Sequence, residues 1–446
     1  MSHLVLDTPA LFTLLRGGYA NLKQHMAVVD ELNVFPVPDG DTGKNMTMTF
    51  EGGVSALEGC DAPVGDAMKA FSRGTLLSAR GNSGVILSQF VRGFAEGSKG
   101  KDALTVADFL LAYQSGVKRA YAAVGDPVEG TMLTVMRQAG EAVDRAADFD
   151  GCLGALTAAM KESLAHTPEL LPVLREAGVV DSGGAGLTYL FEGMWLTEQG
   201  KSVADAADDL PVAAVVAPTD KVTERVRYAV VATANGTGIA NYFREVGAAA
   251  IVEGGQTNNP PAEAFLAAFE RLNAEVILVL PNDSNILMTA RQAAELYDRA
   301  DVRVLPTRSL AEGYSALSMM DLSLPTPEAV IHEMTHYLPN VTTGYVTTAT
   351  RDANLNGVAI TKGHCLGLTP DAILADAEDK VTAALLLLER LPDIADKQVV
   401  TVFVGQGVTP EEQDALAAGI AARWPLIELG FVPGEQAVYF FIMAIE

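Results

Sequence analysis

The sequence is poor in cysteine and in basic residues, and it has no long apolar run. Its three cysteines, Cys60, Cys152 and Cys365, are far apart and match no metal-ligand or disulfide spacing, which suits a reducing cytoplasm. Lys and Arg number 31 against 56 Asp and Glu, a net charge of −25. Without a segregated basic patch, that charge excludes a nucleic-acid partner, because phosphates would be repelled.

Membrane insertion and export are also not expected. The most apolar segment, residues 383–388, ends at Glu389 and Arg390 and predicts a buried helix, so we expect no integral membrane segment. The first residues lack a basic region followed by an apolar core, so no leader is expected.

Site chemistry is densest in residues 33–46, which read NVFPVPDGDTGKNM. Two prolines keep the backbone extended, so Asp39 and Asp41 are presented by a stiffened loop. Two glycines then let the backbone turn closely around an anion. Such a loop suits a hard cation such as Mg²⁺ held by the carboxylates, with Thr42, Asn45 and backbone donors toward phosphate. The alternative is an ordinary polar turn.

Generic phosphate and calcium motifs do not describe this loop. Pro38 occupies the place of the first glycine of a Walker A sequence, and Asn45 the place of its Ser or Thr. An EF-hand loop would need an oxygen ligand and then glycine where Gly43 and Lys44 stand.

A second polar stretch, residues 74–89, places Gly81, Asn82, Ser83 and Gly84 before an apolar helix. That is the arrangement of an anion site at a helix N-terminus. Taken alone, it is equally an ordinary N-cap.

The periodicity changes along the chain. Up to about residue 200 it is helical, with helices expected over 9–31 and from 44 to 53 and a capping box that begins at Thr105. From residue 225, short β-rich runs at 228–233, 248–252, 275–280 and 302–305 alternate with helices near 237–246, 261–272, 284–298 and 310–320. This alternation predicts βαβ units with a parallel sheet and ligands at the carboxyl ends of its strands.

The loop at 33–46 resembles the nucleotide loop of the dihydroxyacetone-kinase-like (DAK2, or DhaL-type) phosphotransferase domain, in the form carried by bacterial fatty acid kinase catalytic subunits. The family signature reads NVFPVPDGDTGTNM, and this chain departs from it only at Lys44. Further resemblance runs through nearly the whole chain. The family's segments GARGNSGVILSQ, PVEGTILTV, VVDSGGQGL, GGQTMNPS, LPNNKN and VPTKS match residues 78–89, 127–135, 179–187, 254–261, 280–285 and 305–309.

The resemblance implies ATP and two Mg²⁺ ions as cofactors. In this family the aspartates chelate Mg²⁺ bound to ATP, which implies that role for Asp39 and Asp41, with Arg80 toward the developing charge. The third ligand is open between Asn33, which aligns with an extra aspartate of the dihydroxyacetone kinases, and nearby Asp30. The residues expected at the nucleotide are Thr42, Gly43, Lys44, Asn45, Met46, Asn82, Ser83, Gly84, Gly130, Thr131, Met132, Asp181 and Gly183.

The expected fold is multidomain α + α/β. An N-terminal all-α DhaL-like helical barrel spans 1–200, a linker spans 201–224, and a C-terminal α/β domain with a largely parallel sheet spans 225–446. The linker replaces the family's zinc-associated middle domain, since no histidine lies between His166 and His332. A homodimer remains compatible with this organisation.

The resemblance implies an ATP-dependent phosphotransferase. A separate DegV-like lipid-binding partner would present a fatty acid whose carboxylate becomes an acyl-phosphate, and the C-terminal half would dock that partner. Two alternatives stay open: a kinase for a small polyol such as dihydroxyacetone, and a non-catalytic nucleotide-responsive scaffold, for which Lys44 and Ser78 leave room.

One further motif, HExxH at residues 332–336, satisfies the short zinc-protease pattern. The GxxH continuation is lacking and Pro339 breaks the segment. We therefore interpret His332 and His336 as structural residues.

Overall fold

The computed structural model describes residues 2–35, 40–201, 225–255, 258–350, 352–355 and 358–446. They form two compact units, the first made of the described residues up to 201 together with 259–264, and the second of the described residues within 225–258 and 265–446. The linker expected at 201–224 lies almost wholly outside the described residues, as does Asp39.

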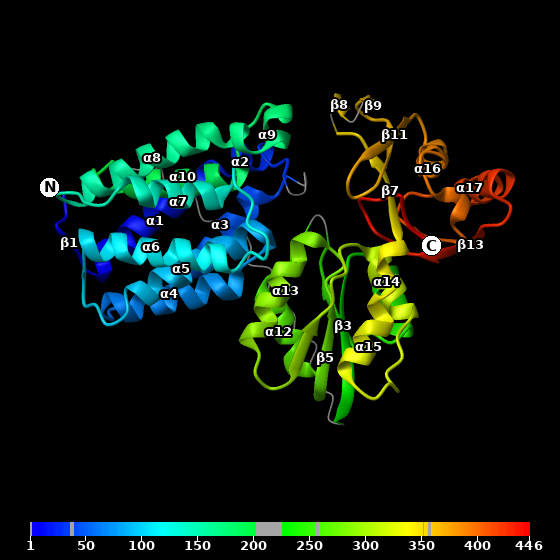
Figure 1. The fold of residues 1–446 in the computed structure, drawn as a ribbon, viewed down its shortest axis with the longest axis horizontal. Helices are drawn as coiled ribbons and strands as arrows, with labels where there is room; N and C mark the ends of the chain where they lie inside the picture. The colour runs from blue at the N-terminus through cyan, green and yellow to red at the C-terminus, as the bar shows by residue number, and fades with distance from the viewer. Residues whose placement is uncertain (1, 36–39, 202–224, 256–257, 351, 356–357) are drawn as a thin grey trace. The chain divides into compact units, whose positions relative to one another are not determined.

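The first unit is helical, as the sequence predicts (Figure 1). Its helices are α1 (Thr8–Gln24), α2 (Met26–Glu31), α3 (Thr42–Ala56), α4 (Val64–Ser78), α5 (Gly81–Gly97), α6 (Val106–Ala122), α7 (Met132–Ala142), α8 (Phe149–Leu170), α9 (Pro172–Ala177) and α10 (Ser182–Glu198). The predicted capping box is present, since Thr105 and Asp108 cap each other's backbone at the start of α6. One short antiparallel pair, β1 (Val5–Leu6) with β2 (Leu104–Thr105), was not predicted.

The helix expected over residues 9–31 is two helices. His25 leaves helical geometry, with φ −99° and ψ 8°, and its ring stacks on Tyr189 with centroids 4.0 Å apart. Its Nδ1 also lies 2.8 Å from the Asn21 carbonyl oxygen. A ring contact with a distant part of the chain therefore ends α1, which periodicity alone does not reveal.

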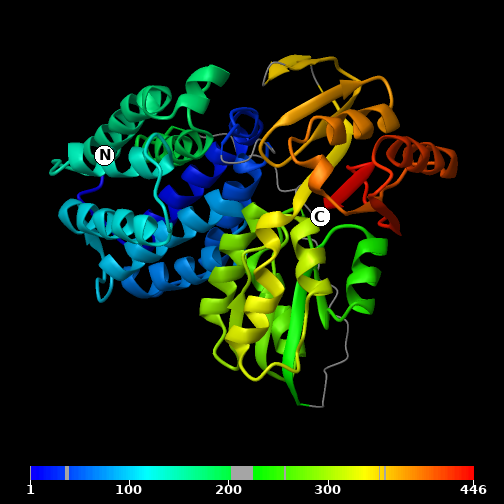
Figure 2. The same cartoon turned by 45° about the vertical axis from the view of Figure 1, so that its right-hand side comes forward.

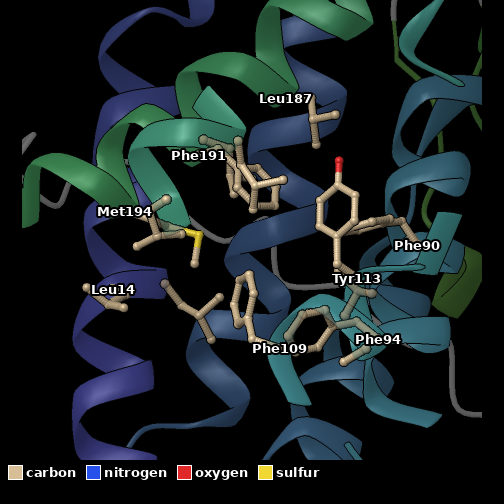
Figure 3. Packing of buried hydrophobic residues seen from close by; sticks show 14 of the residues in the cluster. Leu14, Phe90, Phe94, Phe109, Tyr113, Leu187, Phe191 and Met194 are labelled. Carbon is tan, nitrogen blue, oxygen red and sulfur yellow. The ribbon is translucent and has the colours of Figure 1, made fainter. Parts of the chain in front are cut away.

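Aromatic side chains fill the core of the first unit (Figure 3). Phe90 and Tyr113 meet edge to face with centroids 5.2 Å apart, and Phe94 meets Phe109 in the same way at 5.1 Å. The buried Tyr113 hydroxyl donates to the Met136 carbonyl at 2.9 Å, so this polar atom is satisfied. A cavity of about 40 Å³ within the core is lined by apolar side chains, which offer a water molecule no hydrogen-bond partners.

The second unit contains a four-stranded sheet in which every pair is parallel, in the order β4-β3-β5-β6. Its strands are β3 (Val226–Ala234), β4 (Ala250–Glu253), β5 (Ala274–Leu280) and β6 (Asp301–Val304). The helices that alternate with them are α11 (Thr237–Glu245), α12 (Ala262–Arg271), α13 (Ser284–Leu296) and α14 (Leu310–Ser318), followed by α15 (Pro327–Thr335). Helices α12 and α13 flank the sheet opposite α14 and α15 (Figure 1). The βαβ prediction is confirmed.

The second unit also holds a six-stranded sheet, in the order β11-β10-β7-β14-β12-β13. Its strands are β7 (Thr342–Thr348), β10 (Cys365–Leu368), β11 (Ile373–Ala377), β12 (Val399–Val404), β13 (Glu428–Pro433) and β14 (Phe441–Ile445). Only β12 and β13 pair in parallel. The sequence predicts only the largely parallel sheet; this second, mixed sheet was not predicted. Residues 369–372, which join β10 to β11, are too few for a parallel crossover.

Further elements complete the second unit. They are η1 (Leu338–Asn340), η2 (Ile394–Asp396), β8 (Ala353–Leu355) paired with β9 (Val358–Ile360), α16 (Lys380–Glu389) and α17 (Pro410–Arg423). Figure 2 shows α16 and α17, in orange and red, beside the six-stranded sheet. The predicted buried helix at 383–388 is part of α16.

One apolar core joins the two sheets of the second unit, with buried side chains from β3, β5, β7, β12 and β14. A buried hydroxyl pair also links them, because Ser309 Oγ lies 2.7 Å from Thr343 Oγ1. Both sheets therefore belong to one packed body. Among the described residues, no helix is long and apolar enough to cross a membrane.

Candidate nucleotide site

The N-termini of α3, α5, α7 and α10 meet within the first unit. Ser182 Oγ, at the start of α10, donates to Thr42 Oγ1, at the start of α3, at 3.2 Å. A Cβ built on Gly183 would lie 3.2 Å from the Cβ of Met132, the first residue of α7. Four motifs that are far apart in the sequence thus come together at helix ends, where unpaired N–H groups and the helix dipole favour anions.

Helix α5 approaches α3 closely where its first turn has the glycines Gly81 and Gly84. Gly81 has φ +58°, and a Cβ there would lie 2.5 Å from Asn45 Nδ2. A Cβ on Gly84 would lie 2.4 Å from Thr49 Oγ1. Neither distance is possible for a real Cβ, so glycine is required at both positions for this close approach.

Arg80 precedes α5 as its N-cap residue. Its backbone N–H donates to Thr49 Oγ1 at 3.3 Å, and it supplies no side-chain cap to the helix. The guanidinium Nε is buried and has no hydrogen-bond partner among the described residues. Burial lowers the pKa of Arg80, and the negative charge of Glu51 opposes that shift. A buried cation with an unused donor, beside an uncapped helix N-terminus, is the arrangement expected for a bound phosphate.

The start of α3 carries the carboxylates. Asp41 is its N-cap residue, and the Asn45 N–H donates to the Asp41 carbonyl at 2.8 Å. The half-buried Asp30 carboxylate accepts the Lys44 N–H at 3.1 Å. Burial raises the pKa of Asp30, and the negative charge of Asp41 raises it further, against hydrogen bonds from the Lys44 and Gly43 backbone. The two carboxylates therefore repel each other, which a divalent cation held by their oxygens would relieve.

The oxygen atoms available around the start of α3 can be compared with the ligands that Mg²⁺ prefers. Oxygen ligands suit Mg²⁺, and Asp30 at the end of α2 and Asp41 at the start of α3 supply them. Asn33 is buried, and its N–H donates to the Asp30 carbonyl at 3.1 Å. Asp39, expected to be a ligand, lies outside the described residues, so its role stays a prediction together with the choice between Asn33 and Asp30.

One feature at α3 differs from the expectation that its first N–H groups face phosphate. The Lys44 N–H is already bound by Asp30, and the Lys44 side chain is exposed. No sequence pattern indicated this contact, because Asp30 belongs to the preceding helix α2. The uncapped start of α5 is therefore the better placed anion site.

Asp181 joins the starts of α7 and α10. Its buried carboxylate accepts the Gly184 N–H at 2.7 Å and also the Met132 N–H. Burial raises the pKa of Asp181 to about 6, against these two hydrogen bonds. Asp181 was expected at the nucleotide, and its contacts show that it fixes the relative position of two helix ends.

The loop before α7 is held by hydrogen bonds within the loop and with the first turns of α7. The Gly130 N–H donates to Thr134 Oγ1 at 2.7 Å, and Thr131 Oγ1 donates to the Val128 carbonyl at 2.7 Å. Arg137 Nη2 donates to Glu129 Oε2 at 2.9 Å. Sequence patterns did not identify this network. These hydrogen bonds do not test whether Gly130 and Thr131 contact a nucleotide, so those contacts stay predictions.

The HExxH segment lies on α15 in the second unit. His332 and His336 are both exposed, and their ring centroids are 5.5 Å apart. Nδ1 of His336 lies 2.9 Å from the Glu333 carbonyl oxygen of its own turn. Within the described ranges, no group of three His, Cys, Asp or Glu side chains could hold a metal.

Comparison with known protein families finds one match in each of the two units. A family model described as "DAK2 domain" matches residues 36–196, and a model for the C-terminal region of FakA-like proteins, named after a fatty acid kinase, matches residues 229–446. Protein YloV of Bacillus subtilis (strain 168) is 32% identical over 558 aligned positions, covering 100% of both chains.

Two solved structures are also similar. The dihydroxyacetone kinase from C. freundii, in complex with AMP-PNP and Mg²⁺, is 19% identical with a TM-score of 0.34, covering 42% of this chain and 34% of its own. A DegV family protein from Corynebacterium glutamicum is 14% identical with a TM-score of 0.36, covering 49% of this chain and 97% of its own.

We expect Asp181 to make stability depend on pH. The folded protein holds the Asp181 proton up to about pH 6, whereas the unfolded chain releases it near 3.8. The folded state therefore binds more protons between these values, so the free energy of unfolding should fall as pH rises through this window, by up to about 3 kcal/mol. Asp181→Asn keeps an acceptor for Gly184 and should remove this part of the pH dependence in denaturant titrations.

Asp148→Asn is the matched control for that variant. Asp148 caps α8 by accepting the Gly151 N–H at 2.9 Å, and it reports the general cost of replacing a cap carboxylate by an amide. If the free energies of unfolding of wild type and Asp181→Asn change in parallel between pH 4 and pH 7, Asp181 is not the source of the pH dependence.

Proposed function

The chain belongs to the family of proteins that join a DAK2 domain to a FakA-like C-terminal region, and from that membership we propose that it is an ATP- and Mg²⁺-dependent phosphotransferase. The proposed acceptor is the carboxylate of a fatty acid presented by a separate DegV-like lipid-binding protein. The product is then an acyl-phosphate, with ADP as the leaving group.

The observation that carries this proposal is the unpaired, buried Nε of Arg80 beside the start of α5. The protein has a net charge of −25, so a polyanion such as ATP is repelled unless positive groups gather locally. Arg80 is half-buried, and its buried Nε has no partner among the described residues, next to an α5 start that it does not cap. A buried donor without a hydrogen-bond partner is costly, and a phosphate oxygen that accepts from Arg80 Nε would remove that cost.

The carboxylates beside Arg80 complete the proposed site. Asp30 and Asp41 interact unfavourably as the chain stands, and Asp39 lies two residues before Asp41 in the loop that matches the family signature except at Lys44. Bound Mg²⁺ would supply neutralisation of phosphate charge. The chain's own contribution is to hold the carboxylate oxygens at the start of α3, close to the start of α5.

A fatty acid is a suitable acceptor for such a site. Its carboxylate is already ionised near neutral pH, so an oxygen lone pair can form the new bond to the γ-phosphorus without a general base. The bond from that phosphorus to the bridging oxygen breaks, and the electron pair leaves with ADP. The remaining requirement is alignment and charge stabilisation, which Arg80 and the helix ends can provide.

We assign the second unit to docking of the lipid-binding partner. The support is its match to the C-terminal family of the FakA-like proteins. A kinase for a small polyol and a non-catalytic scaffold are the competing functions. They differ from the proposal in their products: a phosphate ester in the first case and no transfer in the second.

The direct test is acyl-phosphate formation from ATP, Mg²⁺ and a fatty acid loaded on a DegV-like protein, trapped with hydroxylamine as the hydroxamate. Wild type should give product, and Asp41→Asn should reduce the rate by at least about 100-fold, because the metal loses a charged ligand. Asp61→Asn, an exposed carboxylate of the same unit, is the control and should match wild type. Turnover of dihydroxyacetone alone, or ATP binding without any transfer, would overturn the proposal.

A second prediction separates activity from stability at Arg80. Arg80→Met should lower kcat by about 10²–10³-fold, because it removes charge facing the transferred phosphoryl group. It should leave the unfolding temperature unchanged or raised, because a buried donor without a partner is removed. Arg73→Met, an exposed arginine on α4, is the matched control. Equal kcat values for Arg80→Met and wild type would contradict the role of Arg80.

A further inference from the structure

Residues 259–264 follow β4 in the chain, yet they belong to the first unit. The Ala262 N–H donates to the Ala79 carbonyl at 3.3 Å, so this segment lies against the residue that precedes Arg80. Burial lowers the pKa of Arg80, and nearby negative charge, which includes that of Glu263, opposes the shift. A segment remote in the sequence therefore lies beside the start of α5, within the candidate nucleotide site.

Asn259, the first residue of this segment, contacts one of the predicted metal ligands. Its side-chain Nδ2 donates to Asp41 Oδ2 at 2.6 Å, and the residue is only 4% exposed. Gly81 leaves room for this amide, because a Cβ built there would lie 3.2 Å from Asn259 Nδ2. Hydrogen bonds to an ionised carboxylate are about twice as strong as those between neutral groups. The contact therefore restrains the Asp41 side chain.

The Asp41 carboxylate is not used to cap its own helix. An aspartate at an N-cap ordinarily accepts an N–H from the first turn that follows it. Asp41 is the N-cap residue of α3, and among the described residues its side chain makes no such bond. The Lys44 N–H donates instead to Asp30 Oδ1 at 3.1 Å, a residue of the preceding helix α2. Asp30 thus takes the capping role, and the Asp41 carboxylate is held by Asn259.

A neutral amide suits this position better than a cation would. It donates to the carboxylate without cancelling its negative charge, whereas a Lys or Arg would compete with a divalent cation for that charge. The amide also adds little net stability to the fold. Its Oδ1 is buried without a partner among the described residues, which costs about 1–3 kcal/mol, and a hydrogen bond to a charged group gains about 1.5–3 kcal/mol. The contact of Asn259 with Asp41 therefore points to a role in the site.

We propose that Asn259 is a positioning residue that fixes the orientation of the Asp41 carboxylate for nucleotide-bound Mg²⁺. Residues that hydrogen-bond to a metal-binding carboxylate change metal affinity by about 10-fold to 100-fold when they are replaced. The inference rests on the proposed function only through the assignment of Asp41 as a metal ligand. It requires no particular phosphoryl acceptor, so it holds whether or not an acyl-phosphate is formed.

The test is a calorimetric titration of the full chain with AMP-PNP, in excess Mg²⁺ and separately in EDTA, a readout that needs no phosphoryl transfer. In Mg²⁺, Asn259→Leu should raise the dissociation constant by about 10-fold to 100-fold, because it removes the donor at nearly constant volume. Asn259→Ala, which introduces no larger side chain, should have the same effect. In EDTA, wild type and both variants should bind equally weakly, because no metal is present for Asp41 to hold.

Asn21→Leu is the matched control. Asn21 is also 4% exposed and its Nδ2 also donates at 2.6 Å, but the acceptor is the Tyr189 carbonyl and not a carboxylate. This variant should bind AMP-PNP in Mg²⁺ as wild type does, and the unfolding temperature of each variant should show that it folds.

Three results would overturn the role of Asn259: both Asn259 variants bind as tightly as wild type in Mg²⁺, they lose the same factor in EDTA, or Asn21→Leu loses as much. Binding that depends on Asn259, without acyl-phosphate from the loaded partner, would overturn the proposed function and leave this inference standing. A wild type that binds no AMP-PNP in Mg²⁺ would overturn both.

Discussion

The close approach of helix ends in the first unit is the constraint on which the candidate site depends. Helix α5 packs closely on α3 at Gly81 and Gly84, which have no Cβ, and α10 packs on α3 where Gly186 faces the Met46 sulfur, 2.7 Å from where a Cβ would lie. Larger residues at these positions would separate the helices and disperse the N–H groups. Because the helix dipoles act over about one turn, that separation would remove most of their combined attraction for phosphate.

Electrostatics adds a second condition to this geometry. The chain carries 25 more acidic than basic residues, yet it keeps the Arg80 Nε buried and unpaired and places Asp30 where Asp41 raises its pKa. The unpaired Arg80 Nε and the repulsion between Asp30 and Asp41 are each unfavourable. A nucleotide with bound magnesium would offset both at once, and this complementarity is the physical basis for the proposed phosphotransferase.

Much of the fold follows from local patterns. The capping box at Thr105 and the alternation of strands and helices after residue 225 are properties of short sequence windows, and the structure confirms both. The break at His25 and the mixed six-stranded sheet depend on partners distant in the chain, so periodicity does not reveal them. In the site, the glycine-rich motifs were recognisable. The contact of Asp30 with the Lys44 N–H was not, because it depends on how two helices meet.

The central claim is that the starts of these helices form one nucleotide site, and the most direct measurement is hydrogen–deuterium exchange of the full chain with and without AMP-PNP and Mg²⁺. Slower exchange should appear in the amides of residues 81–84, at the start of α5, and in the loop before α3. Unchanged exchange at both places under saturating nucleotide, or protection confined to the second unit, would contradict the account.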